Sequence, residues 1–225
     1  YEETGDRAWI PLAEKAAWLA ASWVMPYDFA FPPESSFGRL DMRTTGTVWA
    51  NVQNKHSAPG ICTLSGVSLL KLYRATGEPR YLELCAQIGH AISQYLSRAD
   101  RPVFGMPDGW MCERVNTSDW ERPQTPVGEG FPASCWCEAA SLLTFAELPG
   151  VYVQPDSGLC VALDHVDASL LGTRLSLFNP TAFDAEVKVM AESSSALGQA
   201  LGQDFARNLP RVRVPAGGRV EFELA

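Results

Sequence analysis

Apolar residues recur at intervals of three and four over the first two thirds of the chain, which is the period of amphipathic helices. Two of these stripes are long enough to predict helices of several turns. One contains Trp9, Leu12, Ala16, Leu19 and Trp23, and the other contains Tyr81, Cys85, Ile88, Ile92 and Tyr95. Large apolar side chains are usually buried, so we expect both stripes to pack in a core.

Two shorter patterns with the same period predict a third and a fourth helix. The third enters a tight turn near residue 73, and the fourth covers about 133–146. Their apolar positions are Leu64, Val67, Leu70 and Tyr73 in the third helix, and Trp136, Ala139, Ala140 and Leu143 in the fourth.

The pattern changes after Leu148-Pro149-Gly150. Short alternating or clustered apolar runs are separated by turn signals such as Asp-Ser-Gly and Asn-Pro, which is typical of an antiparallel β-sandwich. Between these runs, residues 193–208 are expected to form a loop with room for one helical turn. We therefore predict a helical domain over 1–148 and a small β-sandwich over 149–225. The expected strands are 151–153, 159–165, 174–178, 186–190, 212–214 and 220–224.

One turn motif occurs twice, at 1–9 (Tyr-Glu-Glu-Thr-Gly-Asp-Arg-Ala-Trp) and at 73–81 (Tyr-Arg-Ala-Thr-Gly-Glu-Pro-Arg-Tyr). In each copy the glycine can close a helix in the left-handed conformation, and the acidic residue can open the next helix. Pro11 suggests that the first helix properly begins near Ile10. A repeat of this kind predicts stacked helical hairpins.

The connections opposite these tight turns, about 24–61 and 97–132, are long and irregular. Their many aromatic residues make disorder improbable, and long loops in compact domains are usually functional. We expect both loops to fold over the same end of the helical layer and to form the functional face.

The Tyr-x-x-Thr-Gly-Asp/Glu turn between amphipathic helices, with long loops opposite, resembles the six-hairpin glycosidase superfamily. The resemblance covers about residues 1–148 and implies the C-terminal part of an α/α toroid whose cleft binds sugars, with Asp and Glu acting on glycosidic bonds. The Val-x-Val-Pro-Ala-Gly-Gly-x-Val-x-Phe ending is similar to the accessory β-sandwiches of such enzymes. The resemblance to the superfamily also implies that the missing N-terminal part of the same protein is a partner of this chain. No catalytic motif of one family matches, so no catalytic residue is carried over.

The segment 110–121 has the composition that sugar chemistry needs, because glycoside hydrolysis uses two carboxyl groups and tryptophan faces stack on pyranose rings. We expect Glu113 and Asp119 to be catalytic, one of them as a general acid whose pKa is raised by apolar neighbours. The alternative is that Glu113 forms surface ion pairs with Arg114 and that Asp119 caps a turn. The sugar-binding candidates in this segment are Trp110, Trp120, Arg114 and Asn116.

The first loop adds Asn54, His56 and Asp41 as residues that could bind sugar hydroxyls. Asp28 and Asp41 could equally pair with nearby arginines to hold the loop. Glu129 and Glu138 flank the fourth helix, and for Glu138 the positive end of the helix dipole is a sufficient explanation.

Composition excludes several other classes. A net charge of −8 argues against nucleic acid as a partner, and no apolar run is long enough for a membrane span. The chain has no P-loop, dinucleotide or zinc-protease motif, so we expect no cofactor. With three histidines in the whole chain, no His-rich metal site is expected. The six cysteines show no zinc-finger spacing, and free thiols in a reducing cytoplasm are expected.

The sequence thus favours a carbohydrate-active enzyme fragment, a hydrolase or lyase whose cleft the two loops line. Taken alone, a partial toroid would lack walls of its cleft and could be inactive. Two alternatives remain open: a non-catalytic helical-repeat scaffold that binds a protein or glycan, and a sugar epimerase that would depend on His56.

Overall fold

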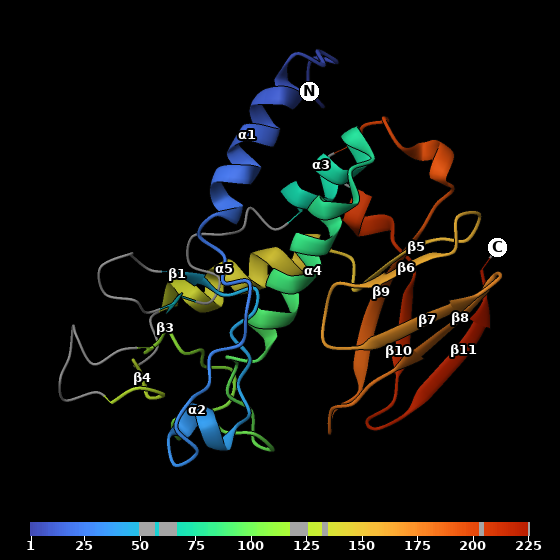
Figure 1. Cartoon of the computed structure of the whole chain (residues 1–225). Helices are drawn as coiled ribbons and strands as arrows, with labels where there is room; N and C mark the ends of the chain where they lie inside the picture. The colour runs from blue at the N-terminus through green and yellow to red at the C-terminus, as the bar shows by residue number, and fades with distance from the viewer. Residues whose placement is uncertain (50–56, 59–66, 118–125, 132–134, 203–204, 225) are drawn as a thin grey trace. The chain divides into compact units, whose positions relative to one another are not determined.

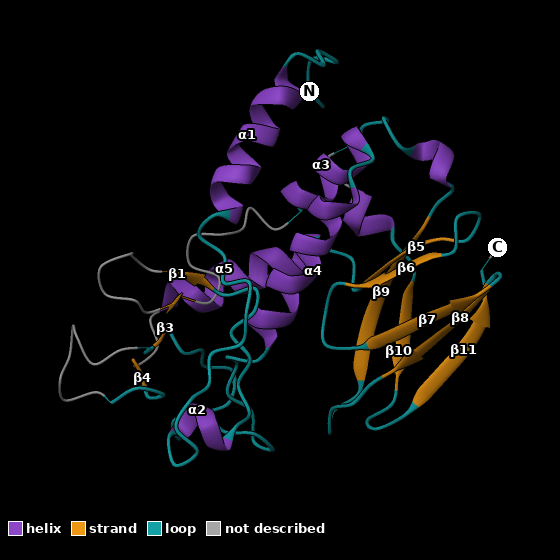
Figure 2. Ribbon diagram, in the orientation of Figure 1, coloured by secondary structure: helices purple, strands orange, loops and turns teal. Residues whose placement is uncertain are grey.

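The computed structural model describes residues 1–49, 57–58, 67–117, 126–131, 135–202 and 205–224. The longer helices lie in the first two thirds and the longer strands in the last third, as predicted, and four strands of two residues each also lie in the first part (Figure 1, Figure 2). Within these residues four helices have seven or more residues, no ring of hairpins is seen, and no helix is long and apolar enough to cross a membrane. The helices are α1 (Trp9–Ala21), α2 (Ser36–Arg39), α3 (Ser68–Thr76), α4 (Pro79–Ser93) and α5 (Cys135–Glu147).

Contacts between residues divide the chain into two compact units. Unit 1 comprises 1–17, 66–86 and 145–225, and unit 2 comprises 18–65 and 87–144. Helical and strand segments therefore share unit 1, while both long loops belong to unit 2. The boundary at residues 148 and 149 stays a prediction.

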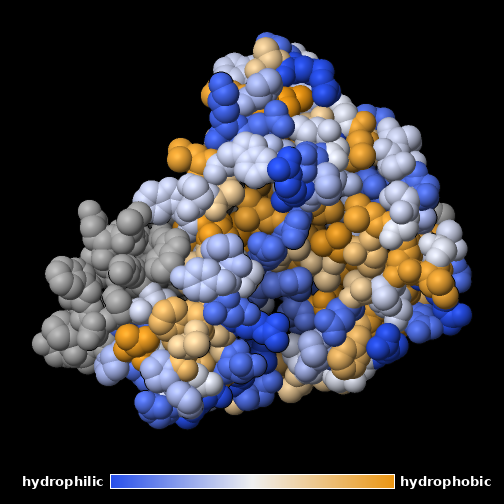
Figure 3. All heavy atoms as spheres, in the orientation of Figure 1, coloured by the Kyte–Doolittle hydropathy of each residue, from blue (hydrophilic) through white to orange (hydrophobic). Residues whose placement is uncertain are grey.

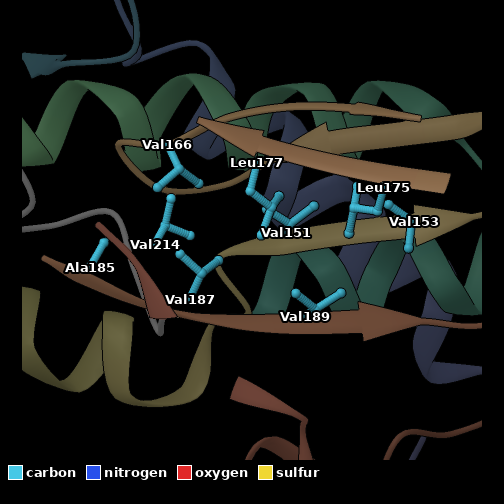
Figure 4. Close-up of a cluster of buried hydrophobic side chains, with 9 residues drawn as sticks. All are labelled: Val151, Val153, Val166, Leu175, Leu177, Ala185, Val187, Val189 and Val214. Carbon is cyan, nitrogen blue, oxygen red and sulfur yellow. The ribbon is translucent and has the colours of Figure 1, made fainter. Parts of the chain in front are cut away.

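The strands of unit 1 form two small sheets with the orders β10-β9-β5-β6 and β11-β8-β7. Neighbouring strands are antiparallel except for β5 and β9, which are parallel. Their apolar side chains gather between the strands (Figure 4). The strands are β5 (Val151–Gln154), β6 (Leu159–Ala162), β7 (Asp167–Leu171), β8 (Arg174–Phe178), β9 (Ala185–Ala191), β10 (Arg211–Val214) and β11 (Arg219–Glu223).

Six of these strands match predicted runs, and β7 was not predicted. Its side chains alternate between exposed and half-buried, and Asp167 and Ser169 weaken the apolar signal. It forms a hairpin with β8 through Gly172, whose φ of +62° is in the left-handed region. The segment expected to be a loop contains two short 3-10 helices, Ser194–Ala196 and Phe205–Asn208.

The repeated turn motif has the same hydrogen bonds in both copies. The glycine N–H donates to the carbonyl of the tyrosine four residues earlier, at 2.8 Å for Gly5 and 2.7 Å for Gly77, and both glycines have positive φ (+68° and +75°). The threonine hydroxyl oxygen accepts the N–H of the acidic residue at 3.2 and 3.1 Å. The acidic side chain in turn accepts the N–H two residues later at 2.8 and 3.2 Å. The predicted repeat is therefore confirmed at the level of the turn.

The predicted apolar stripes differ in how far their side chains are buried. The apolar residues of α4 are buried as expected, and so are Val67, Leu70 and Tyr73 around α3. The prediction for α1 was wrong, because every residue of its stripe is exposed and its buried side chains are Ile10 and Ala17. In α5, Leu142 and Leu143 are also exposed. Periodicity identifies an apolar face, but it does not show what covers that face.

A buried ion pair joins α3 to the end of strand β9 inside unit 1. Nε and Nη2 of Arg74 donate to the two carboxylate oxygens of Glu192, each at 2.7 Å, and the side chains are 6% and 13% exposed. The hydroxyl of Tyr152 donates to Glu192 Oε1 at 2.5 Å, and Arg74 Nη1 donates to the carbonyl of Gln199 at 2.8 Å. Unit 1 is therefore one packed body of helix and sheet.

Candidate functional site

The two long loops meet in unit 2. Four short strands form one sheet in the order β1-β2-β3-β4, and β2 from the first loop pairs with β3 from the second. The aromatic ring of Phe37 in α2 packs edge-on against Phe104 at 4.8 Å and against Tyr95 at 6.0 Å. These strands are β1 (Val48–Trp49), β2 (Ser57–Ala58), β3 (Arg114–Val115) and β4 (Gly130–Phe131).

An open pocket of about 410 Å³ lies where these loops pack together, and we call it the loop pocket. Its wall combines two charged groups, an Arg guanidinium and a Glu carboxylate, with apolar side chains. Its volume is within the usual range for small-ligand sites. The lining residues are Ser36, Arg39, Leu40, Pro102, Phe104, Gly105 and Glu129.

The carboxylate of Glu129 is fixed by the start of α2. The Ser36 N–H donates to Glu129 Oε1 at 2.8 Å, and Phe37 N–H donates to the carbonyl of Gly128 at 2.9 Å. Ser35 caps the short helix, since its hydroxyl oxygen accepts the N–H of Gly38 at 3.0 Å. Ser35 therefore fixes the start of α2, and the Ser36 N–H at this start holds one carboxylate oxygen of Glu129 in place.

Phe104 forms part of the pocket wall in a conformation that non-glycine residues rarely adopt, with φ at +51°. Neighbouring hydrogen bonds hold this turn, with the Ser97 hydroxyl donating to the carbonyl of Met106 at 2.8 Å and accepting the Val103 N–H at 3.1 Å. Asp41, directly after the pocket residue Leu40, also has a positive φ of 49°. Strained backbone positions concentrate at functional sites, so two of them beside one pocket favour a binding role.

Arg39 is exposed, and its guanidinium donates to the carbonyl of Glu34 and, at 3.4 Å, to the hydroxyl of Ser36. A guanidinium presents five N–H donors in a planar fork, so donors remain for a ligand. Together with the carboxylate of Glu129, it gives the pocket both a charged donor and a charged acceptor. This pairing suits a ligand with several hydroxyl groups.

The sequence candidates lie elsewhere in unit 2 or outside the described residues. Glu113 is partly exposed and Trp110 about half exposed, and neither lines the loop pocket. Asp41 is exposed. The backbone of Arg114 lies in β3. Asp119, Trp120, Asn54 and His56 lie outside the described residues.

Asn116 is buried, and its side chain is engaged within the loop. Its side-chain amide donates to the carbonyl of Pro126 at 3.2 Å. Its backbone N–H donates to the carbonyl of Glu129 at 3.1 Å, and its own carbonyl accepts the N–H of Gly128 at 2.9 Å. These contacts favour a role in positioning the Glu129 segment over direct contact with a sugar.

Two further carboxylates hold loops. Partial burial alone would raise the pKa of Asp28. Hydrogen bonds from the Thr45 N–H and hydroxyl, at 3.0 and 2.8 Å, oppose this effect, and the pKa of Asp28 is lowered overall. Glu138, in the first turn of α5, accepts the N–H of Met111 at 2.7 Å. Its other oxygen is buried and has no hydrogen-bond partner among the described residues. For Asp28 the loop-holding interpretation is the one that the contacts support.

Four of the cysteines carry thiols that form no disulfide bond: Cys85, Cys112, Cys137 and Cys160. Burial raises the pKa of Cys85 to about 12 and also raises the pKa of Cys160. A raised pKa keeps these thiols protonated and unreactive. Across the described ranges, no group of three or more His, Cys, Asp or Glu residues is arranged to hold a metal ion.

Arg39 and Glu129 were not predicted as site residues. A signal was available in the Gly-Glu-Gly run at 128–130, since glycines on both sides of an acidic loop residue indicate close packing. Comparison of the chain with protein-family models, with curated proteins and with solved structures found no match.

Proposed function

We propose that this protein is a carbohydrate-active enzyme, a glycoside hydrolase that binds sugar at the loop pocket. One observation carries the proposal: two loops distant in sequence build a single pocket that holds a carboxylate and a guanidinium beside an apolar wall. Sugars present hydroxyl groups on their edges and C–H groups on their faces, and this wall offers a partner for each.

In the proposed complex, Arg39 donates to sugar hydroxyls and the Glu129 carboxylate accepts from them, while Phe104 and Leu40 supply apolar contact. Glu113, which does not line the loop pocket, and Asp119, which lies outside the described residues, keep their proposed roles as acid and base, because hydrolysis requires two carboxyl groups. Whether the reaction retains or inverts the anomeric configuration depends on the separation of those two groups.

We further propose an α/α toroid as the setting of this chemistry. The hairpin of α3 and α4 and the repeated Thr-Gly-Asp/Glu turn support that proposal, since toroids are built from such hairpins. The intact ring would place the long loops around its cleft.

A panel of neutral and acidic oligosaccharides on an array, followed by calorimetry on the best ligand, tests the pocket. Hydrogen bonds to charged groups contribute about 1.5–3 kcal/mol, so Glu129→Gln and Arg39→Met should each weaken binding roughly 10- to 100-fold. The matched control is Glu34→Gln, an exposed carboxylate in the same segment. Wild-type affinity in both pocket variants would remove the loop pocket from the proposal.

A non-catalytic glycan-binding scaffold is the second candidate. It is favoured by the fact that Glu129 is the one carboxylate among the residues lining the pocket in the described part of the chain. Measuring new reducing ends with the bound oligosaccharide separates the two functions. Release that is lost in Glu113→Gln or Asp119→Asn supports the hydrolase, and binding without release supports the scaffold. Activity that depends on His56, tested with His56→Ala, would indicate an epimerase.

A further inference from the structure

A second pocket, of about 340 Å³, lies within unit 1 where residues of α1, of α3 and of the first three positions meet, and we call it the α1–α3 pocket. Its volume is near the lower end of the range for small-ligand sites. Hydrophilic and hydrophobic side chains lie close together on the surface near the N-terminus (Figure 3). The pocket is lined, among others, by Tyr1, Glu2, Trp9, Ile10, Lys71 and Leu72.

The polar part of this lining contains an ion pair that the fold holds in place. Lys71 Nζ donates to Glu2 Oε2 at 2.6 Å, and the two side chains are 27% and 20% exposed. The Leu201 N–H donates to the other carboxylate oxygen of Glu2 at 3.2 Å, and the Tyr1 hydroxyl donates to the carbonyl of Gly198. These hydrogen bonds fix the acidic part of the pocket before any ligand binds, which lowers the entropic cost of binding.

Apolar side chains make up most of the rest of the lining. The Trp9 side chain is 54% exposed, although tryptophan is highly buried on average. Ile10 and Leu72, each 8% exposed, line the same pocket. The Arg7 guanidinium lies 5.6 Å from the centre of the Tyr1 ring, so one face of that ring already contacts a cation. Trp9 is therefore the aromatic ring that the pocket offers to a ligand.

We propose that the α1–α3 pocket is a second sugar-binding site, which takes one ring of a neutral oligosaccharide. A pyranose ring has C–H groups on its faces, which stack on an indole ring, and hydroxyl groups on its edge. The Lys71 ammonium has three N–H donors and the Glu2 carboxylate has about four lone-pair positions, so both can bind sugar hydroxyls while their ion pair stays intact. The inference goes beyond the proposed function, because unit 1 alone builds this pocket and the loop pocket lies in unit 2.

The ion pair disfavours other classes of small ligand. A wholly apolar ligand would remove water from Glu2 and Lys71 without supplying new hydrogen bonds, which costs free energy. A ligand with a net charge gains little, because the opposite charges of the pair are 2.6 Å apart and largely cancel at a distance. An uncharged ring with hydroxyl groups replaces the lost water and also covers Trp9. A sugar therefore suits both the polar and the apolar part of the lining.

Titrations of the whole chain carrying Glu129→Gln test the proposal, because this substitution weakens the loop pocket and lets the remaining binding report on unit 1. Maltohexaose, cellohexaose, xylohexaose and mannohexaose, raised to about 10 mM in calorimetry, cover ligands of millimolar affinity. Trp9→Ala and Lys71→Met should each weaken the remaining binding at least about 5-fold, because one removes the stacking ring and the other a charged donor. The matched controls are Leu12→Ala and Lys15→Met, since both residues are exposed on α1 and neither lines the pocket.

The variants separate this proposal from the proposed function. Remaining binding that Trp9→Ala and Lys71→Met both weaken, and that the controls leave unchanged, supports the second site. Remaining binding that survives either substitution, or that the controls weaken equally, overturns it, because another surface must then be responsible. If the wild type binds sugar and the Glu129→Gln variant does not, the second site is overturned and the proposed function stands. If the wild type binds none of the four sugars, both proposals are overturned.

Discussion

The buried pair Arg74–Glu192 gives the sharpest test of how unit 1 is held together. Both side chains are largely withdrawn from water, and the guanidinium meets the carboxylate with two hydrogen bonds of 2.7 Å. Removing one member of a buried pair leaves an uncompensated charge, with a typical loss of about 3–5 kcal/mol of unfolding free energy. Replacing both members by apolar residues of similar size is often far less harmful.

The remaining contacts rank the two single substitutions. Glu192→Leu leaves Arg74 with backbone carbonyl partners and deprives the Tyr152 hydroxyl of its acceptor, so we expect the full loss of about 3–5 kcal/mol. Arg74→Met leaves Glu192 with the hydroxyl of Tyr152 as a donor, so we expect a smaller loss of about 2–3 kcal/mol. At about 2–4 °C per kcal/mol, these losses lower the melting temperature by roughly 4–20 °C.

Urea unfolding followed by circular dichroism measures the effect, and a double-mutant cycle isolates the coupling. The double variant Arg74→Met/Glu192→Leu should be more stable than Glu192→Leu alone, with a coupling of at least about 1 kcal/mol. The exposed pair Arg213–Asp184 is the control, and Arg213→Met should leave the midpoint unchanged. Additive single effects would refute the argument, because they would show that the two side chains do not stabilise the fold as a pair.

Three further predictions follow from single positions. Gly77→Ala should destabilise the protein by about 1–2 kcal/mol in urea unfolding, because φ is +75° there and the nearest atom to an added Cβ is 3.7 Å away, so conformation and not collision is responsible. Gly130→Ala should abolish binding at the loop pocket while the melting of unit 1 is retained, because an added Cβ would lie 2.0 Å from the ring of Phe104. Cys85 should resist thiol reagents in the folded protein. Burial raises the pKa of Cys85 to about 12 in the folded state, so its contribution to stability is complete below pH ~9 and declines as the pH rises from 9 towards 12. A pH series of unfolding curves measures this decline, and the Cys85→Ala variant should not show it.

Local signals in the sequence predicted the four longer helices and six strands of the last third, but not α2 or the short strands β1 to β4. The Thr-Gly-Asp/Glu turns followed from glycine's tolerance of positive φ and from acidic caps, and the hydrogen bonds of both copies match. The strands of the two small sheets followed from alternation, with β7 missed because two of its five residues are Asp and Ser. These features depend on residues close together in the chain, which is the information that periodicity carries.

Burial and the loop pocket depend on contacts between residues that are far apart in the sequence, and local sequence patterns do not indicate these contacts. Trp9 and Tyr81 occupy matching places in the repeat, yet one is exposed and the other buried. Glu129 became a pocket residue because Ser36, more than ninety positions away, donates its N–H to the carboxylate. No pattern within one loop indicates which residue of the other loop will lie opposite.

The loop pocket can be tested without reference to unit 1, because unit 2 alone builds it. Every residue that lines the loop pocket lies within 36–40, 102–105 or at 129, so a ligand there contacts unit 2 alone. Glutamine keeps an oxygen that can accept the Ser36 N–H, so Glu129→Gln should weaken sugar binding there and leave the midpoint of urea unfolding unchanged. If this substitution also lowered the midpoint, Glu129 would have a structural role, and the loss of binding could not be assigned to the missing charge.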